Sequence, residues 1–213
     1  MSLKINEIFY SIQGESSYTG LPCIFIRLTF CNLRCNYCDT EYAFYEGEDW
    51  SISKILTKIK EYPCNLVMVT GGEPLLQDNC ITLMKELLNH NYNVMLETSG
   101  SLKLSDVPKE VVKIVDFKCP SSNMAKKNNW SILSDINKND EIKFVIGNKD
   151  DYDWCKKMIK EYNLHSICPL LFSPVYDKID MKVLSEWILN DGIDVRLQMQ
   201  LHKHIWGSET KGV

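Results

Sequence analysis

Short apolar runs rich in branched residues alternate with segments of helical period along most of the chain. Seven such runs predict buried strands, at residues 23–30, 66–69, 94–96, 111–117, 142–146, 167–172 and 195–199. Helical periodicity predicts helices at residues 52–62, 78–89, 130–136, 151–162 and 181–189. Strand followed by helix, repeated in this way, is typical of an α/β fold with a parallel sheet.

The length of the chain argues against a closed barrel. It has 213 residues, whereas a complete eight-stranded β/α barrel typically takes about 250. Only about a dozen residues, including Pro108, separate the strand that ends at Glu97 from the one that begins near Val111, which is too short for a crossover helix. We therefore expect one domain, residues 1–213, built as a partial parallel β/α barrel of six or seven strands with at least one shortened helix.

Composition narrows the classes of partner. No apolar run approaches the roughly 20 residues that span a bilayer, so we expect no membrane segment. The net charge is -4, and the basic residues occur as scattered pairs such as Lys126–Lys127. Scattered pairs of this kind are typical of solvated helix faces and do not resemble a nucleic-acid footprint.

Three cysteines carry the most chemical information. Cys31, Cys35 and Cys38 lie within eight residues, directly after the first apolar run. Three thiolates from one loop can hold a 4Fe-4S cluster and leave one iron without a protein ligand, whereas an electron-transfer ferredoxin normally supplies a fourth cysteine. The open iron predicts that a substrate or cofactor binds at the metal.

Two other interpretations of the cysteines fit less well. Structural zinc sites need four ligands, and His202 and His204 are spaced too closely for a zinc finger. A disulfide framework is disfavoured because the cysteine count of nine is odd and the chain opens without an apolar leader. We expect the thiols to be reduced and the protein to be cytoplasmic.

Other polar motifs follow the later strands. They are Thr70-Gly71-Gly72-Glu73-Pro74, Glu97-Thr98-Ser99-Gly100, Lys118-Cys119-Pro120-Ser121-Ser122 and Ser173-Pro174. The carboxyl ends of barrel strands share one mouth, so these motifs should ring a single site. Each could instead be a tight turn or a local cap. The carboxylate of Glu73 favours a ligand site, because it could pair with a ligand ammonium group.

The spacing Cys31-x-x-x-Cys35-x-Tyr37-Cys38, together with Thr70 to Pro74, resembles the radical S-adenosylmethionine superfamily. The resemblance implies that the amino and carboxylate groups of S-adenosylmethionine chelate the open iron. It also implies that reduction of the cluster cleaves this cofactor to methionine and a 5'-deoxyadenosyl radical. The cofactor carries that chemistry, and the protein positions it.

A narrower resemblance covers nearly the whole chain. The segments Ile5 to Phe9, Ser11 to Glu15, Phe25 to Arg27, Cys38 to Thr40, Glu97 to Gly100 and Gln200 to Lys203 are similar to the 7-carboxy-7-deazaguanine synthase family. This implies a carbon-nitrogen lyase that converts 6-carboxy-5,6,7,8-tetrahydropterin to 7-carboxy-7-deazaguanine with loss of ammonia. Its product enters the 7-deazapurine pathway to queuosine.

By position, the resemblance also implies the site residues. The pterin is held by Ile12, Gln13, Gly14, Glu15, Arg27, Thr70 and Val213, with Glu15 and Arg27 as catalytic residues. S-adenosylmethionine is held by Gly72, Glu73, Thr98, Ser99, Cys119, Pro120, Ser121 and Ser173, the 4Fe-4S cluster by Cys31, Cys35 and Cys38, and Mg²⁺ by Thr40. Arg27 suits its role because a guanidinium fork matches a carboxylate.

The resemblance further implies a homodimer and a flavodoxin- or ferredoxin-like reductant. The chain departs from the family at Ser16, usually glycine, and at Phe30, often a small residue. Two alternatives stay open: a glycyl-radical activating enzyme of the same superfamily, and an iron-sulfur redox module without catalysis. The Gln13-Gly14-Glu15 and Cys38-Asp39-Thr40 elements favour the synthase over the activating enzyme.

Overall fold

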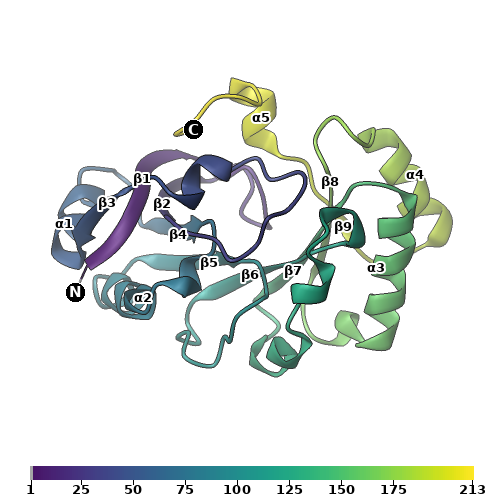
Figure 1. Ribbon diagram of the computed structural model, residues 1–213, viewed down its shortest axis with the longest axis horizontal. Coiled ribbons are helices and arrows are strands. Elements are labelled where there is room, and N and C mark those ends of the chain that lie inside the picture. The colour runs from purple at the N-terminus through teal and green to yellow at the C-terminus, as the bar shows by residue number, and fades with distance from the viewer. Residues whose placement is uncertain (1) are drawn as a thin grey trace.

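The computed structural model describes residues 2–213 and contains one continuous sheet (Figure 1). Its strands, in spatial order, are β3 (Glu48–Ser51), β1 (Ser2–Ile12), β2 (Pro22–Leu28), β4 (Leu66–Gly71), β5 (Asn93–Thr98), β6 (Val112–Phe117), β7 (Glu141–Ile146), β8 (Leu170–Pro174) and β9 (Arg196–Leu197). The strands β2, β4, β5, β6, β7, β8 and β9 run parallel to one another, which confirms the prediction of seven parallel strands.

Two strands at one edge were not predicted. β1 and β3 pair antiparallel, β1 with β2 and β3 with β1. Within β1 only Leu3 and Ile5 are fully buried, because most of the strand mixes polar with half-buried residues. Such a strand lacks the continuous apolar run of a buried parallel strand, so the hydrophobic pattern did not reveal it.

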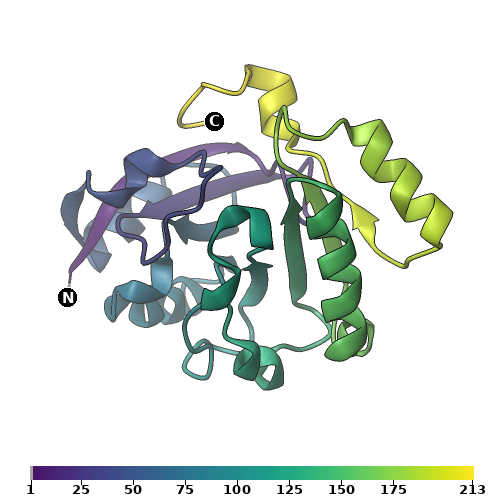
Figure 2. The same ribbon diagram turned by 45° about the vertical axis from the view of Figure 1, so that its right-hand side comes forward.

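The α-helices are α1 (Ile52–Ile59), α2 (Asn79–Asn89), α3 (Lys149–Glu161), α4 (Met181–Asp191) and α5 (Leu201–Trp206). The helices α1 to α4 cover the outer face of the sheet. The helix α5 lies on the other side of the sheet, at the open end of the partial barrel (Figure 2). The predicted helix at 130–136 is a 3-10 helix, Trp130–Asp135, and β5 connects to β6 without a helix. These connections confirm the prediction that at least one helix of the partial barrel is shortened. Within residues 2–213 every helix is too short or too polar to cross a bilayer.

The inner face of the sheet has two layers. Phe9 faces Phe25 across β1 and β2, with ring centroids 4.8 Å apart, and Phe25 faces Met68 across β2 and β4. Two residues closer to the carboxyl end of β2, Arg27 faces Thr70. Because side chains alternate between faces along a strand, all five point inward. The apolar layer therefore closes one end of the interior, and a polar layer lies at the carboxyl ends.

Side chains, rather than strand pairing, bring the two ends of the sheet together. The side chain of Gln198, just after β9, accepts a hydrogen bond from the Ser16 N–H at 2.8 Å and donates to the Ser16 carbonyl at 3.2 Å. Glu141 accepts from the Ser17 N–H at 3.0 Å. The sheet is thus curved and open, as expected of a partial barrel. Ser16 has a φ of 67°, a conformation that favours glycine, and Gln198 holds it there.

Gln198→Leu should lower the free energy of unfolding by about 1–3 kcal/mol, because the buried Ser16 amide loses its acceptor and the Ser16 carbonyl loses one of its donors. Chemical denaturation measures this change. Arg196→Ala, an exposed position on the preceding strand β9, is the control and should change stability by less than about 0.5 kcal/mol. Equal effects of the two substitutions would show that Gln198 does not hold the ends together.

Candidate functional site

A cavity of about 700 Å³ opens at the carboxyl ends of the strands. Most of the predicted site residues line it: Ile12, Gln13, Gly14, Glu15, Arg27, Cys31, Cys35, Cys38, Thr40, Thr70, Gly72, Thr98, Ser99, Ser173 and Val213. The remaining predicted residues, Glu73, Cys119, Pro120 and Ser121, are not among the residues of its wall. The fold therefore gathers the three-cysteine loop and the expected pterin residues around one space.

The cysteine loop is shaped by its own backbone contacts. The Arg34 guanidinium donates to the carbonyls of Cys31 at 2.8 Å and Leu33 at 2.6 Å. The Tyr37 hydroxyl, which the sequence left as either a core or a stacking group, donates to the Val145 carbonyl at 3.2 Å. This bond ties the loop to β7 and places Tyr37 on the cavity wall.

The donor set of the loop fits an open iron-sulfur cluster. Cys31, Cys35 and Cys38 are half-buried, and they are the cysteines of the cavity wall. Within residues 2–213 no three potential metal ligands already converge on one point, so binding must draw these thiols together. Burial raises the pKa of Cys35 to about 11. Cluster binding must therefore displace thiol protons, as thiolate ligation requires.

Glu73 lies outside the cavity wall, and its pairing with a ligand ammonium group stays a prediction. Its side chain is fully buried, and its carboxylate accepts hydrogen bonds from the Thr98 hydroxyl at 2.9 Å and from the Ser99 amide at 2.8 Å and hydroxyl at 2.6 Å. The Leu75 amide donates to it as well, at 3.1 Å. Glu73 therefore positions Thr98 and Ser99, which do line the cavity.

The segment after β6 also lies behind the wall rather than on it. Cys119 is fully buried, with its sulfur 3.5 Å from that of Cys155. Ser121 donates both its amide, at 2.9 Å, and its hydroxyl to Asp151. These bonds use the amide and hydroxyl of Ser121 within the protein, and contact of Cys119, Pro120 and Ser121 with the cofactor stays a prediction. The segment supports the cysteine loop from the outside.

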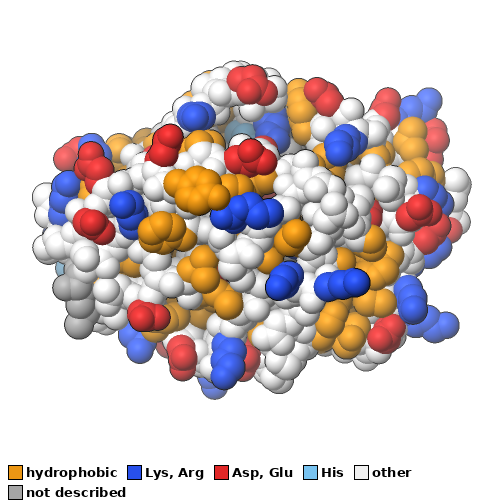
Figure 3. Space-filling view, in the orientation of Figure 1, with side chains coloured by type: hydrophobic (Ala, Val, Ile, Leu, Met, Phe, Trp, Pro, Cys, Tyr) orange, Lys and Arg blue, Asp and Glu red, His pale blue; other side chains and the backbone are white. Residues whose placement is uncertain are grey.

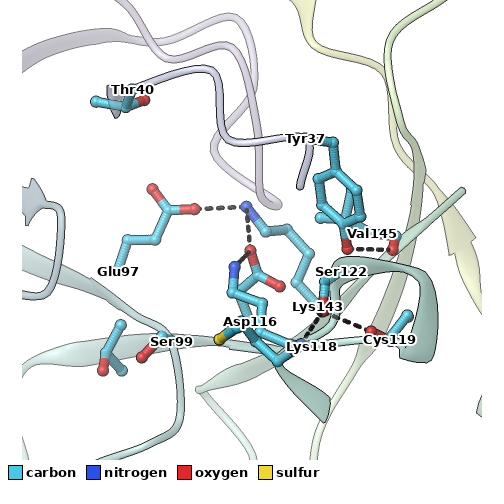
Figure 4. Close-up of polar contacts among 12 residues, drawn as sticks. Tyr37, Thr40, Glu97, Ser99, Asp116, Lys118, Cys119, Ser122, Lys143 and Val145 are labelled. Atoms are coloured by element: carbon cyan, nitrogen blue, oxygen red, sulfur yellow. Dashed lines mark hydrogen bonds and ion pairs between the residues drawn. The ribbon is translucent and has the colours of Figure 1, made fainter. Parts of the chain in front are cut away.

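A buried lysine occupies the centre of the polar layer. The Lys143 ammonium lies 2.7 Å from Glu15. It lies 3.7 Å from Asp116 and also contacts Glu97 (Figure 4). Lys118 pairs with Asp116 at 2.7 Å. Burial by itself would raise the pKa of Glu15, but the Lys143 charge outweighs burial and lowers it. The same carboxylates raise the pKa of Lys143 against its burial.

Sequence reasoning did not single out Lys143 or Asp116. The signal was present, because each is a charged residue inside a mostly apolar strand run, residues 142–146 for Lys143 and 111–117 for Asp116. A charge is rarely fully buried unless it is paired. Asp116 faces Lys143 directly across β6 and β7, and this register makes the pair.

Three buried side-chain polar atoms have no hydrogen-bond partner within residues 2–213, and two of them belong to residues that line the cavity. These two are Nε2 of Gln13 and Oδ1 of Asp116. The amide orientation of Gln13 is set by the Glu15 N–H, which donates to Oε1 at 3.2 Å. Buried polar groups are nearly always satisfied. A bound ligand would supply an acceptor to Gln13 and a donor to Asp116.

The charge of Arg27 is held in place by neighbours. Its Nε lies 2.7 Å from Glu7, and the Tyr42 hydroxyl donates to the same Glu7 oxygen at 2.9 Å. Arg27 faces Thr70 across two strands, and both line the cavity. The pair with Glu7 orients the guanidinium without removing it from the wall.

The C-terminal region covers the other side of the cavity. A Cβ added to Gly14 would lie 2.1 Å from Nδ1 of His202, so only glycine fits at this contact. Burial lowers the pKa of His202, although the Glu15 charge opposes this, and the imidazole is neutral at pH 7. The tail from Ser208 to Val213 lines the cavity too. His202 and Val213 thus both reach the wall.

Thr40 lies at the rim, where its hydroxyl donates to Asp39 at 2.9 Å. Asp39 also pairs with Lys203 at 2.7 Å. Burial alone would raise the pKa of Asp39, but Lys203 outweighs it and lowers the pKa. A hydroxyl and an ionised carboxylate therefore lie side by side at the rim.

Comparison with known proteins gives concordant results. Residues 25–117 match the Radical SAM superfamily. The 7-carboxy-7-deazaguanine synthase of Koribacter versatilis is 43% identical over 99% of this chain and 100% of its own, and that of Chlorobaculum tepidum is 40% identical over 99% and 97%. The crystal structure of QueE from Escherichia coli superposes with a TM-score of 0.79 at 24% identity, covering 95% of each chain, which shows the same fold.

Lys143→Met should lower the free energy of unfolding at about pH 7 by about 3–5 kcal/mol, because it removes a buried cation and leaves the largely buried Glu15 without its partner. The pH dependence has a definite sign. In the wild type the pKa of Glu15 lies below its ordinary value of 4.5, so its contribution is complete above that value and is lost as the pH falls. In the variant, burial favours protonated Glu15. The loss of unfolding free energy relative to the wild type should therefore become smaller as the pH falls toward about 4.

Urea denaturation of both proteins across this pH range measures the effect. Lys149→Met is the control, because the Lys149–Asp153 pair at 2.9 Å is about half exposed and should contribute at most about 1 kcal/mol. A deficit of Lys143→Met that stayed constant with pH would argue against the coupling between Lys143 and Glu15.

Proposed function

The chain belongs to the 7-carboxy-7-deazaguanine synthase family, and we propose that it catalyses the reaction for which that family is named. It converts 6-carboxy-5,6,7,8-tetrahydropterin to 7-carboxy-7-deazaguanine with loss of ammonia, as a carbon-nitrogen lyase on the route to queuosine. One observation carries the proposal: a single cavity joins a loop with three open thiols to a wall of fixed charges. The two unpartnered polar atoms on that wall await a ligand.

The 4Fe-4S cluster is held by Cys31, Cys35 and Cys38, and S-adenosylmethionine lies against Gly72, Thr98, Ser99 and Ser173. When bound, these two groups supply the radical that starts the reaction. The protein fixes their surroundings. Glu73 holds Thr98 and Ser99 through the hydrogen bonds described above, so two cofactor-facing residues are preorganised before any ligand enters.

The pterin is held on the side of β1, β2 and β4. Arg27 binds its carboxylate through a planar fork, which Glu7 orients. The unpartnered Nε2 of Gln13 donates to a ring acceptor, and Glu15 accepts from a ring N–H while Lys143 keeps it ionised. The stacked rings of Phe9 and Phe25 form an apolar floor for the bicyclic ring. Each of these groups is fixed by a neighbour, so binding costs little reorganisation.

We further propose a magnesium ion at Thr40, completed by substrate oxygens and waters. Few protein ligands and retained waters are the habit of Mg²⁺, and the adjacent oxygens of Thr40 and Asp39 support the location. Magnesium there would stabilise negative charge on the substrate carboxylate during rearrangement.

The remaining proposals concern the reductant, the oligomeric state and the cellular compartment. A flavodoxin- or ferredoxin-like protein supplies the electron, and the enzyme works as a homodimer in the cytoplasm. The nine cysteines all lie within the described residues and none forms a disulfide, which supports a reducing compartment. β9 is an edge strand of the sheet. Leu197 on this strand and Met199 just after it are each more than a third exposed, and this edge is available to a second copy.

The decisive experiment uses protein purified without oxygen and reconstituted with iron and sulfide. With reductant, S-adenosylmethionine and the carboxytetrahydropterin, product of the mass of 7-carboxy-7-deazaguanine should form. Formation of 5'-deoxyadenosine without that product would favour a glycyl-radical activating enzyme. Absence of both, in protein that carries the cluster, would favour a redox module.

Replacement of Cys31, Cys35 or Cys38 by Ala should abolish bound iron, brown colour and product, because no other cysteine of residues 2–213 lines the cavity. Iron analysis and the visible spectrum measure this without turnover. Cys64→Ala is the control, since its sulfur contacts the Pro22 carbonyl at 3.2 Å, away from the cavity. Loss of iron in the control, with iron retained in Cys35→Ala, would overturn the ligand assignment.

Thr40→Val keeps the shape of the side chain but removes its oxygen. If Thr40 binds magnesium, stimulation of turnover by Mg²⁺ should fall about tenfold, while 5'-deoxyadenosine still forms. If Thr40 serves only as a partner of Asp39, stability should fall and the response to Mg²⁺ should stay intact. Thr57→Val, in α1, controls for loss of a hydroxyl, because Thr57 bonds only to the Ser53 carbonyl.

A further inference from the structure

The tail after α5, residues 208–213, is held only weakly by the rest of the protein. Within residues 2–213 no backbone hydrogen bond joins the tail to another segment. The Thr210 hydroxyl donates to the Trp206 carbonyl of α5 at 2.7 Å. The tail still lines the cavity. In Figures 1 and 2 it runs back toward β1, and in Figure 3 it forms a ridge along the top edge of the molecule.

The tail meets an aromatic ring of the cavity wall. The Lys211 ammonium lies 4.3 Å from the centre of the Tyr42 ring, and among the described residues it has no ion-pair partner. Gly212 lies beside Glu7, because a Cβ added to it would be 3.9 Å from Oε2 of that carboxylate. An aromatic face attracts a cation at such a distance. The contact of Lys211 with Tyr42 therefore holds the tail over the cavity.

Tyr42 also holds the arginine that is expected to bind the substrate. Its hydroxyl donates to Oε1 of Glu7 at 2.9 Å, and the same oxygen accepts from Nε of Arg27 at 2.7 Å. The guanidinium carbon of Arg27 lies 5.9 Å from the centre of the Tyr42 ring and 6.0 Å from that of Phe9. Within residues 2–213 only Nε of this guanidinium has a protein acceptor. Its terminal nitrogens are therefore left for a ligand carboxylate.

The charges around Tyr42 do not balance. At the distances given above, Arg27 and Lys211 supply two positive charges and Glu7 supplies one negative charge. A ligand carboxylate on Arg27 would balance this set and weaken the repulsion between the two cations. Binding of the carboxylate would then stabilise the tail over the cavity. Such coupling is reciprocal, so the tail in this position would also favour binding of the carboxylate.

We propose that Tyr42 is a positioning residue that couples closure of the tail to the orientation of Arg27. The inference rests on the proposed function, because the pterin carboxylate is the anion that Arg27 would bind. The ring holds Lys211 and the hydroxyl holds Glu7, so substitution can separate the two contacts. Tyr42→Phe keeps the ring and loses the hydroxyl, whereas Tyr42→Leu loses both.

Tryptic cleavage after Lys211 measures opening of the tail, and both variants keep that lysine. Protein that carries the cluster and S-adenosylmethionine is held free of oxygen and reductant, so that no turnover occurs. Intact mass follows release of residues 212–213, with and without 6-carboxy-5,6,7,8-tetrahydropterin. When opening is fast relative to cleavage, the rate reports the open population. Titration calorimetry gives the Kd of the pterin and of S-adenosylmethionine.

Tyr45→Leu is the matched control. Tyr45 lies in the same segment as Tyr42, but it is 69% exposed, contacts Arg34 and is not among the residues of the cavity wall. This substitution removes an aromatic ring and a hydroxyl without touching Lys211 or Glu7. The control should match the wild type in cleavage rate and in both Kd values, within about twofold.

The pterin should slow cleavage of the wild type at least about fivefold. Tyr42→Leu should be cleaved about two- to fivefold faster than the wild type even without the pterin, as expected for loss of an exposed cation–π contact. Tyr42→Phe should be cleaved at the wild-type rate without the pterin. It should nevertheless bind the pterin about three- to tenfold more weakly, because Glu7 loses a hydrogen bond, while its Kd for S-adenosylmethionine stays within about twofold.

Cleavage of Tyr42→Leu at the wild-type rate, or an equal effect of Tyr45→Leu, would overturn the proposal. Equal losses of affinity for the pterin and for S-adenosylmethionine in Tyr42→Phe would show that Tyr42 only supports the fold, and would overturn it as well. Failure of the proposed function is distinguishable. In that case the wild type would form no 7-carboxy-7-deazaguanine even with dithionite, whereas Tyr42→Leu would still be cleaved faster than the wild type without the pterin.

Discussion

The contact between the Lys143 ammonium and its surrounding carboxylates is the interaction on which the site depends. Glu15 follows β1, Glu97 lies on β5, Asp116 on β6 and Lys143 on β7, so one buried cation joins four parts of a sheet that does not close by strand pairing. A buried charge is tolerated only when it is paired. The fold is therefore constrained to keep these strands close enough for the carboxylates to reach one point, and the cavity forms above them.

Polar groups at the carboxyl ends divide into two kinds. Some are saturated within the protein, such as Glu73, whose carboxylate accepts from Thr98, Ser99 and Leu75. Others have an atom without a hydrogen-bond partner within residues 2–213, such as Nε2 of Gln13 and Oδ1 of Asp116. The first kind fixes the geometry, and the second kind is left for the ligand. This division explains why residues next to one another in a motif, such as Gly72 and Glu73, have different roles.

Two residues near the cavity have a left-handed backbone conformation. Ser16 and Phe30, the two positions where the chain departs from its family, both have positive φ values, 67° and 81°. The family prefers glycine or a small residue there, and these are the residues that adopt such conformations readily. Here the strain is compensated by neighbours, since Gln198 bonds both backbone groups of Ser16. Strain of this kind is common at functional sites.

The sequence by itself determined the parallel sheet, the shortened connections and the cysteine loop, because these follow from local patterns: apolar runs, residue spacing and connection length. It could not show β1 and β3, whose half-polar residues make sense only once they pair at an edge. It also could not show that Thr98 lines the cavity whereas Glu73 is buried behind it, and it did not single out Lys143. Whether a polar side chain faces the cavity or is used up behind it depends on register and hydrogen-bond partners distant in sequence, and only the tertiary structure brings those together.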